Sequence, residues 1–270
     1  MMSKKSQNRK VGLFVTCLVD TMRPSVGFAA IQLLEQAGCK VAVPQAQTCC
    51  GQPSYNSGDA SDTRLVAKKV IEAFEDFDYV VAPSGSCAAM IKEHYAELFE
   101  TEPYWASRAQ TLSAKTYELV SFLVDICGMT KVEAKLDAKV TYHDSCSGLR
   151  ELSVKEQPRK LLKSMEGLTI SEMSRPETCC GFGGLFCVKY PEISGKIVDE
   201  KSQDIEDSGA DILAAGDLGC LMNMSGRLHR RESDIRSYHV AEILADMTDT
   251  PAIGAPAKEF TLENLKKGGS

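Results

Sequence analysis

The sequence predicts an α/β fold made of two related halves, each a small parallel sheet flanked by helices, with cysteine loops at the carboxyl edge of its strands. The first observation is a repeated set of four cysteines in one order: Cys17, Cys49, Cys50 and Cys87, then Cys146, Cys179, Cys180 and Cys220. Matching members lie 129, 130 or 133 residues apart, and Thr-Cys-Cys-Gly occurs at both 48–51 and 178–181. The second observation is the β-α-β order of apolar runs and helical patterns around both sets, which is typical of parallel strands joined by right-handed crossovers.

The first half begins with a short apolar, β-branched run at 11–16, which predicts a strand. A helix is expected over 25–37, where Phe28, Ile31 and Leu34 follow helical spacing and Gly38 marks the end. The remaining elements are expected in the order strand 40–43, helix 61–77, strand 79–82 and a helix from about residue 88.

The second half repeats this order. We expect strands at 140–143, 168–170 and 212–215, with helices at 158–165, at 192–207 and from about residue 218. A last strand at 235–238 and a helix at 240–247 complete the pattern. The predicted organisation is a flexible N-terminus (1–9), a first cysteine-rich half (10–100), a helical connection (101–138), a second cysteine-rich half (139–248) and a flexible tail (249–270).

Each cysteine or cysteine pair of the two sets follows a predicted strand. Because loops after the carboxyl ends of parallel strands meet at one edge of a sheet, three loops can bring four thiols together in each half. Thiolate is the metal-binding form of cysteine, and soft thiolates select iron–sulfur clusters, zinc or copper(I). Zinc sites usually contain close C-x₂₋₄-C pairs, and the sequence holds no C-x-x-C, so an iron–sulfur centre is favoured. Gly51 and Gly181 let the backbone approach the centre closely or adopt positive φ.

His143 stands three residues before Cys146. It can tune a metal centre by hydrogen bonding or relay a proton, and it can equally be a strand-end histidine that the backbone satisfies. Cys39 and Cys127 each neighbour a predicted helix end, which favours buried core thiols. For Cys187 core packing is also favoured, with a spare ligand or a redox role as the alternative.

The remaining polar candidates receive no functional role. Arg150 is interpreted as a solvated loop charge. The other three histidines lie in helical contexts without a partner motif: His94, His229 and His239.

Composition excludes some classes of function. A net charge of −6 and a pI near 5.4 argue against a nucleic-acid partner. No apolar run approaches the roughly 20 residues that cross a bilayer, and the apolar stretch after the basic N-terminus is too short for a secretory signal. We therefore expect a cytoplasmic protein that is not integral to a membrane. Eleven cysteines in a reducing compartment favour metal binding or redox chemistry over disulfides.

Four motifs carry a resemblance to a known family: Thr-Cys-Cys-Gly-Gln-Pro-Ser-Tyr-Asn-Ser-Gly at 48–58, Pro-Ser-Gly-Ser-Cys at 83–87, His-Asp-Ser-Cys at 143–146 and Cys-Cys-Gly-Phe-Gly-Gly at 179–184. Over residues 10–247 the chain resembles the cysteine-rich CCG domain family. This family includes the cysteine-rich subunit of heterodisulfide reductase, the iron–sulfur subunits of glycolate oxidase and anaerobic glycerol-3-phosphate dehydrogenase, and the lactate utilization proteins. The chain looks most like the lactate utilization proteins of the A type.

The resemblance implies one or two iron–sulfur clusters of the [4Fe–4S] type, cubane or non-cubane, bound by the eight repeated cysteines. In the fullest form of the family each motif ends in C-x-x-C, but here Ser84 and Asp217 replace the first of these two cysteines. Oxygen ligation by Ser84 or Asp217, a vacant coordination position and a different cluster are the alternatives.

The implied function is electron transfer in a complex that oxidises L-lactate to pyruvate, with lactate utilization proteins B and C as partners. The chain would then act as the iron–sulfur subunit of an oxidoreductase complex of the L-lactate dehydrogenase type, and an activity of the chain by itself is left open. Two alternatives stay open. One is thiol–disulfide redox catalysis at a cluster, as in heterodisulfide reductase, and the other is a zinc-stabilised interaction module.

Overall fold

We analysed a computed structural model of the protein, which describes residues 9–255. The expected flexible N-terminus therefore lies almost wholly outside the described residues, as does most of the expected tail. The described part of the tail is held against the second half. The Ile253 amide donates to the Ser237 carbonyl, and the Tyr238 hydroxyl donates to the carbonyls of Thr248 and Thr250. Residues 249–255 thus differ from the expectation of a flexible segment.

The first half contains a four-stranded parallel sheet in the order β2-β1-β3-β4. Its strands are β1 (Arg9–Leu13), β2 (Cys39–Ala42), β3 (Tyr79–Ala82) and β4 (Thr116–Glu118). The second half contains a parallel sheet in the matching order β6-β5-β7-β8. Its strands are β5 (Lys135–His143), β6 (Glu166–Ile170), β7 (Ile212–Ala215) and β8 (Arg236–His239). The predicted fold class, two related α/β halves, is confirmed.

The helices follow the same repeat. Those of the first half are α1 (Cys17–Met22), α2 (Pro24–Gln36), α3 (Gln52–Ser57), α4 (Ala60–Phe74), α5 (Gly85–Ala89), the π-helix η1 (Met90–His94), α6 (Tyr95–Leu98), α7 (Pro103–Ala114), α8 (Leu119–Ser121) and the π-helix η2 (Phe122–Ile126). Those of the second half are α9 (Cys146–Arg150), α10 (Glu156–Leu162), α11 (Phe186–Lys189), α12 (Pro191–Asp207), α13 (Leu218–Arg230) and α14 (Val240–Leu244).

Residues 101–138, which we expected to form a helical connection, contain the strand β4 and the start of β5. β4 pairs with β3 and completes the first sheet. A strand of three residues is too short to show a period of two, so the sequence pattern around it indicates helix alone. The short helices α1, α3 and α9 were likewise not predicted. Each comes directly after a cysteine loop and is shorter than two turns.

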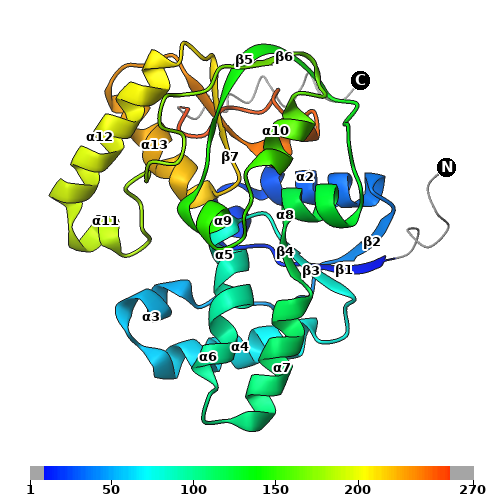
Figure 1. Ribbon diagram of the computed structural model, residues 1–270. Coiled ribbons are helices and arrows are strands. Elements are labelled where there is room, and N and C mark those ends of the chain that lie inside the picture. The colour runs from blue at the N-terminus through cyan, green and yellow to red at the C-terminus, as the bar shows by residue number, and fades with distance from the viewer. Residues whose placement is uncertain (1–8, 256–270) are drawn as a thin grey trace, which may run out of the picture.

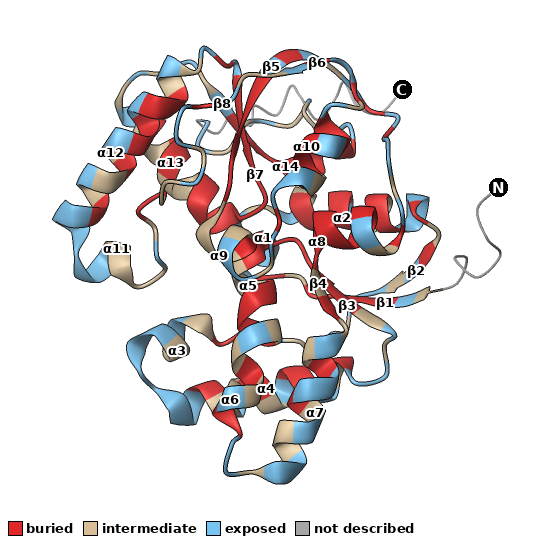
Figure 2. Ribbon diagram, viewed as in Figure 1, coloured by how far each residue is buried: buried red, intermediate tan, exposed pale blue. Residues whose placement is uncertain are grey.

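One hydrophobic core lies between the two sheets and joins the halves. Figure 1 shows α2, α8 and α10 between the second sheet, at the top, and the first sheet below. In this core α2 packs against α14, and α8 packs against α10. Two further cores lie on the outer faces of the sheets, under α4 and α7 in the first half and under α12 and α13 in the second. Figure 2 shows the buried residues of these helices turned toward the sheets. The halves therefore form one body with the cysteine loops where they meet.

Glu118, the last residue of β4, is fully buried at the amino end of α8. Its Oε2 accepts a hydrogen bond of 2.9 Å from the Ser121 amide. Burial raises the pKa of Glu118 from 4.5 to about 7, so the folded state holds this proton more tightly than the unfolded chain. The resulting stabilisation is complete below about pH 4.5 and is lost as the pH rises through about 7.

Glu118→Gln keeps an oxygen acceptor for Ser121 but cannot ionise. We expect the variant to gain up to about 3 kcal/mol of unfolding free energy relative to the wild type between about pH 4.5 and pH 8. Urea unfolding at both pH values measures this difference. Glu133→Gln, at a glutamate whose side chain is 89% exposed, is the matched control. Parallel pH profiles for Glu118→Gln and the wild type would contradict the prediction.

Candidate sulfur-rich redox site

The first set of cysteines converges at the carboxyl edge of the first sheet. Cys17 opens α1, Cys49 and Cys50 lie in the loop after β2, and Cys87 lies in α5. The sulfur atoms of Cys50 and Cys87 are 3.5 Å apart, and the Gly51 amide donates to the Cys49 sulfur at 3.5 Å. The Tyr95 hydroxyl holds this loop in place, since it donates to the Cys50 carbonyl at 2.8 Å.

The second set repeats this arrangement. Cys146 opens α9, Cys179 and Cys180 lie in the loop after β6, and Cys220 lies in α13. The Gly181 amide donates to the Cys179 sulfur at 3.3 Å. The Cys180 carbonyl accepts from Asn223 Nδ2 at 2.8 Å, where the first half uses Tyr95. The three strand-end loops of each half therefore bring four thiols together, as the parallel topology predicts.

Gly51 and Gly181 have φ of +84° and +81°, a backbone conformation that residues other than glycine rarely adopt. At Gly181 an added Cβ would also lie 2.8 Å from the Ser194 carbonyl oxygen. The turn at these glycines lets the amide of each glycine donate to the sulfur of the first cysteine of the pair before it. Positive φ, which the sequence suggested, is thus what the two loops use.

Hydrogen bonds among the thiols and burial shift their pKa values in opposite directions. A hydrogen bond to Cys49 and burial raise the pKa of Cys17, whereas hydrogen bonds from Cys17 and Cys50 hold the pKa of Cys49 far below its usual range. Hydrogen bonds to Cys49 and Cys87, together with burial, raise the pKa of Cys50. Cys49 therefore ionises easily, whereas Cys17 and Cys50 ionise only when a cation compensates for their burial.

In the second set the pKa values of all four thiols are raised. Burial raises the pKa of Cys146, and a hydrogen bond to Cys180 together with burial raises that of Cys179. For Cys220 a hydrogen bond from Cys180 lowers the pKa, but burial together with the negative charges of Asp217, Cys146 and Cys179 outweighs it, and the net pKa is raised. These thiols are protonated at neutral pH, so a metal that binds them must displace their protons.

Each set of thiols faces its own cavity. The first cavity, of about 270 Å³, is lined by the first four cysteines together with residues of the second half, among them Phe182, Leu185 and Val188. The second cavity, of about 210 Å³, is lined by the second four cysteines together with residues of the first half, among them Gln52, Tyr55 and His94. The segment that follows each Cys-Cys-Gly loop thus covers the cavity of the opposite half.

Ser84 and Asp217 occupy matching positions at the amino ends of α5 and α13. Ser84 Oγ accepts from the Cys87 amide, and Asp217 Oδ1 accepts from the amides of Gly219 and Cys220. The two side chains also meet, because Ser84 Oγ donates to Asp217 Oδ2 at 3.0 Å. Ser86 adds two further donors to the same carboxylate oxygen. Both oxygen groups that we considered as extra ligands are therefore engaged in capping and in a bond between the halves, and ligation by either one remains an untested alternative.

His143, at the end of β5, lies beside the second set. One of its imidazole nitrogens and the sulfurs of Cys180 and Cys220 lie within 4.8 Å of one another. The side chain is buried, and neither ring nitrogen has a hydrogen-bond partner among the described residues. Burial lowers the pKa of His143 to about 3, so the ring is neutral. A neutral, unpartnered imidazole at this place is costly unless a further group accepts or donates there.

The residue at the corresponding place in the first half, 129 positions earlier, is Phe14, whose side chain is buried against Phe74. The two halves therefore differ at this corresponding position, which holds an imidazole in one half and a phenyl ring in the other.

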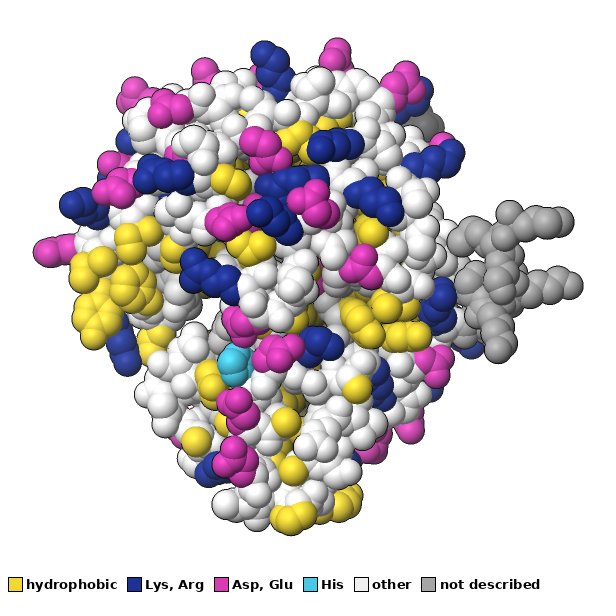
Figure 3. All heavy atoms as spheres, in the orientation of Figure 1, with side chains coloured by type: hydrophobic (Ala, Val, Ile, Leu, Met, Phe, Trp, Pro, Cys, Tyr) yellow, Lys and Arg dark blue, Asp and Glu magenta, His cyan; other side chains and the backbone are white. Residues whose placement is uncertain are grey.

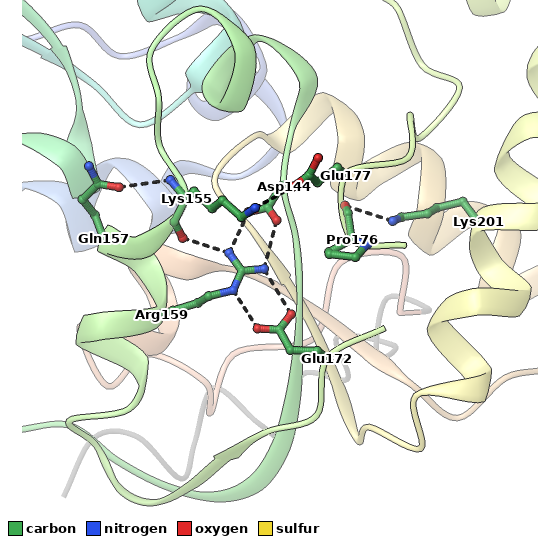
Figure 4. A network of polar contacts seen from close by, with 8 residues as sticks. All are labelled: Asp144, Lys155, Gln157, Arg159, Glu172, Pro176, Glu177 and Lys201. Carbon is green, nitrogen blue, oxygen red and sulfur yellow. Dashed lines mark hydrogen bonds and ion pairs between the residues drawn. The ribbon is translucent and has the colours of Figure 1, made fainter. Parts of the chain in front are cut away.

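A buried ion-pair network supports the loops of the second set (Figure 4). Arg159 on α10 pairs with both carboxylate oxygens of Asp144, at 2.8 and 2.9 Å, and with Glu172 at 2.6 Å. Lys201 on α12 donates to the carbonyls of Arg175 and Pro176 at 2.7 and 3.1 Å. Because Asp144 lies two residues before Cys146, the network fixes the direction in which this cysteine leaves the sheet.

The structure also places the other cysteines. Cys39 and Cys127 are buried in the core between the sheets, as predicted, with their sulfurs 3.9 Å apart. Cys187 is half-buried in α11 and donates to the Gly184 carbonyl at 3.1 Å, so the prediction of core packing is wrong for this residue. The helix that holds it is four residues long and reaches the surface, which a short apolar run does not reveal.

Sequence reasoning missed His94. Its ring joins Tyr55 to Glu151 at the wall of the second cavity, and these three residues come from α3, η1 and the residue after α9. No local motif connects positions so far apart in the chain. His239 and Glu242 instead form a buried capping box at the start of α14, and His229 and Arg150 are exposed.

Hydrophobic side chains gather at the left edge of the molecule in Figure 3, over α11 and the start of α12. The exposed members of this patch are Val188, Tyr190 and Ile193, which are 73%, 54% and 55% exposed. Val188 also lines the first cavity, so the patch adjoins the first set of cysteines.

Comparison with known proteins agrees with this geometry. A family model described as a cysteine-rich domain, CCG, matches residues 11–92 and 140–225, one match in each half. Lactate utilization protein A of Halalkalibacterium halodurans is 52% identical over 235 residues, which are 87% of this chain and 96% of that protein. Lactate utilization protein A of Bacillus subtilis is 48% identical over 87% of this chain and 98% of its own length. The chain belongs to the CCG cysteine-rich domain family, in the group of lactate utilization protein A.

A solved structure from Helicobacter pylori, of a hypothetical protein, shares the fold. It has a TM-score of 0.61 and 12% sequence identity over 91% of this chain, which spans 51% of that protein's length. The CCG matches cover the repeated cysteines of both halves and end before β8. Within the described residues, no helix of this CCG protein is long and apolar enough to span a lipid bilayer.

Proposed function

We propose that the protein is the iron–sulfur subunit of an L-lactate-oxidising complex and that it carries electrons between the oxidation of lactate to pyruvate and a further acceptor. The observation that carries the proposal is the pair of four-thiol sets, each facing its own cavity. The names and high identity of the relatives favour a role in lactate utilization.

The donor atoms fit an iron–sulfur centre. Eight soft sulfur donors lie in two groups of four, and adjacent cysteines can bind two irons of one cluster more readily than one tetrahedral ion. When bound, such a cluster supplies one-electron transfer at a potential that the surrounding hydrogen bonds and burial set. Cys17, Cys49, Cys50 and Cys87 would hold one centre, and Cys146, Cys179, Cys180 and Cys220 the other, each of the [4Fe–4S] type.

The chain's own residues have definite tasks in this proposal. The amides of Gly51 and Gly181 donate to cysteine sulfurs and stabilise their thiolate form. His143, whose ring is neutral, can donate a hydrogen bond from one ring N–H to a sulfur of the second centre. The hydrophobic patch of Val188, Tyr190 and Ile193 offers a docking surface next to the first centre, for which lactate utilization proteins B and C are the proposed partners. Eleven free thiols favour the reducing cytoplasm as the location.

Iron, acid-labile sulfide and zinc analysis of anaerobically purified protein, with EPR spectroscopy, tests the cofactor. Growth of a deletion strain on L-lactate tests the physiological role. We expect iron and sulfide in equal amounts, and a growth defect that the intact gene restores. Normal growth of the deletion strain, in an organism without another lactate dehydrogenase, would reject the lactate assignment.

A zinc-stabilised module is the second candidate, since His143, Cys180 and Cys220 form a donor group that zinc also accepts. Stoichiometric zinc without sulfide would favour it. Thiol–disulfide catalysis at the centre is the third candidate, and trapping of Cys50 or Cys180 by a disulfide substrate would favour that.

His143→Phe gives the second half the residue that the first half has at Phe14. We expect the second centre's reduction potential to fall, because hydrogen bonds to cluster sulfurs raise that potential, while the first centre keeps its EPR signal and potential. In the empty protein we expect the same variant to unfold at higher urea, because it removes two buried unpartnered nitrogens at about 1–3 kcal/mol each.

His229→Phe, at an exposed histidine, is the control for both measurements. An unchanged second potential in His143→Phe would show that the imidazole does not touch that centre.

A further inference from the structure

Three polar side chains form a hydrogen-bonded chain at the wall of the second cavity. The Tyr55 hydroxyl lies 3.3 Å from His94 Nδ1, and His94 Nε2 lies 2.8 Å from Glu151 Oε2. The rings of Tyr55 and His94 are also in contact, with centroids 5.0 Å apart. Neutral His94 with its proton on Nε2 satisfies both bonds, since Nε2 then donates to Glu151 and Nδ1 accepts from Tyr55.

This hydrogen-bonded series of side chains leads from solvent into the cavity. Glu151 is exposed at the outer end, and His94 and Tyr55 are half-buried. All three line the cavity that the second four cysteines face. His94 is the last residue of the π-helix η1, a rare turn that is frequent at functional sites and that here turns the ring toward the opposite half.

Among the described residues, the first cavity has no such hydrogen-bonded series. Its walls carry the apolar side chains of Leu18, Leu185 and Val188, and Leu185 stands 130 residues after Tyr55, in the matching place. Among the described residues, neither histidine nor tyrosine nor glutamate lines it. Asp217 lines both cavities, so the cavities differ in the Tyr55–His94–Glu151 series, which only the second one has among the described residues.

The other titratable groups around the second cavity leave His94 as its proton acceptor. Asp217 is bound by Ser84 and Ser86, and burial lowers the pKa of His143, beside Cys180 and Cys220, to about 3, so that this ring stays neutral. Besides Tyr55 and Glu151, the other titratable groups that line the cavity are the four thiols, and the exposed Arg150 is the nearby cation that acts on Cys179. Lys92, on the same π-helix, turns away and donates to the carbonyls of Ser113 and Thr116. No lysine or arginine of the described residues lines this cavity. Negative charge that arrives at the second thiol set therefore faces an imidazole, His94, whose Nε2 is already paired with the carboxylate of Glu151.

We propose that Tyr55, His94 and Glu151 couple reduction of the second sulfur centre to the uptake of one proton, whereas the first centre changes charge without one. The proposal rests on the proposed function, because it needs an iron–sulfur centre at the second thiol set. One electron from a redox partner protein is gained by that centre, and one proton from water, entering past Glu151, binds His94 Nδ1. The Tyr55 hydroxyl then rotates and accepts from Nδ1. Oxidation returns the electron and the proton by the same route.

EPR-monitored redox titration of the anaerobically purified full-length protein, at several pH values between about 6 and 8, tests this coupling. Cys50→Ala and Cys180→Ala, each of which removes a ligand from one set, assign the signals to the two centres. We expect the potential of the second centre to fall as the pH rises, by at most about 59 mV per pH unit, and the potential of the first centre to stay constant.

His94→Gln keeps a polar side chain but cannot take up a proton, so we expect it to abolish the pH dependence without loss of iron. His229→Gln, the same change at an exposed histidine, should keep that dependence. Glu151→Gln should move the dependence to lower pH, because the imidazolium loses its partner.

A pH-independent second potential in the wild type, or an unchanged slope in His94→Gln, overturns proton coupling alone. A protein without iron and sulfide overturns the proposed function and this proposal together.

Discussion

Replacing Cys180 with alanine is expected to remove about half of the bound iron and sulfide. Cys180 is 2% exposed and interacts with both Cys179 and Cys220, so its loss opens the middle of the second thiol set. The first set lies at the end of the other sheet and keeps its four sulfurs. Iron and sulfide analysis with EPR spectroscopy should therefore show that the first centre is intact in Cys180→Ala. The same measurements on Cys50→Ala should show that the second centre is intact.

Cys39→Ala and Cys127→Ala are the matched controls, because both remove a buried thiol from the core between the sheets. They should retain the full metal content. Complete loss of iron in Cys180→Ala would mean that the eight sulfurs hold a single shared centre, and an unchanged content would remove Cys180 from the ligands.

Arg159→Met is expected to cost about 3–5 kcal/mol of unfolding free energy. Arg159 and Asp144 are 6% and 1% exposed, and the guanidinium holds both oxygens of the carboxylate. Removal of the arginine leaves a buried carboxylate without its charge partner, which is the costly way to break such a pair. Urea unfolding of the empty protein measures the effect. The second set should also bind metal more weakly, because Asp144 directs the chain into Cys146.

Lys135→Met breaks an exposed pair with Glu166, whose side chains are 69% and 73% exposed, and should cost less than about 1 kcal/mol. If Arg159→Met were as mild, the ion pair would not stabilise the fold. The double variant Arg159→Met with Asp144→Leu should recover part of the loss, since no buried charge remains unpaired.

The sequence predicts the strands most closely where polar residues bound an apolar run. The bounds of β3 and β7 are those predicted, because an aspartate stands before each strand and Pro83 or Gly216 follows it. The convergence of the cysteines also follows from sequence, since the carboxyl ends of parallel strands share one edge.

Other features depend on how the halves pack and leave no local pattern. The bond between Ser84 and Asp217 joins residues 133 positions apart, and His94 meets Glu151 only because α9 lies against α5. The strand β4 is too short to show its period. Each of these features is set by contacts between segments rather than by the residues of one segment.

The crossed covering of the two cavities bears on the origin of the chain. A single repeat lacks a lid for its own sulfurs, so an ancestor with one repeat needed a second copy, in a two-fold symmetric dimer, to finish either site. Fusion of two such repeats into one chain would make the pair permanent and would allow each covering segment to change independently. One covering segment could then become apolar and the other polar. A symmetric dimer does not allow this difference, because every substitution appears in both sites.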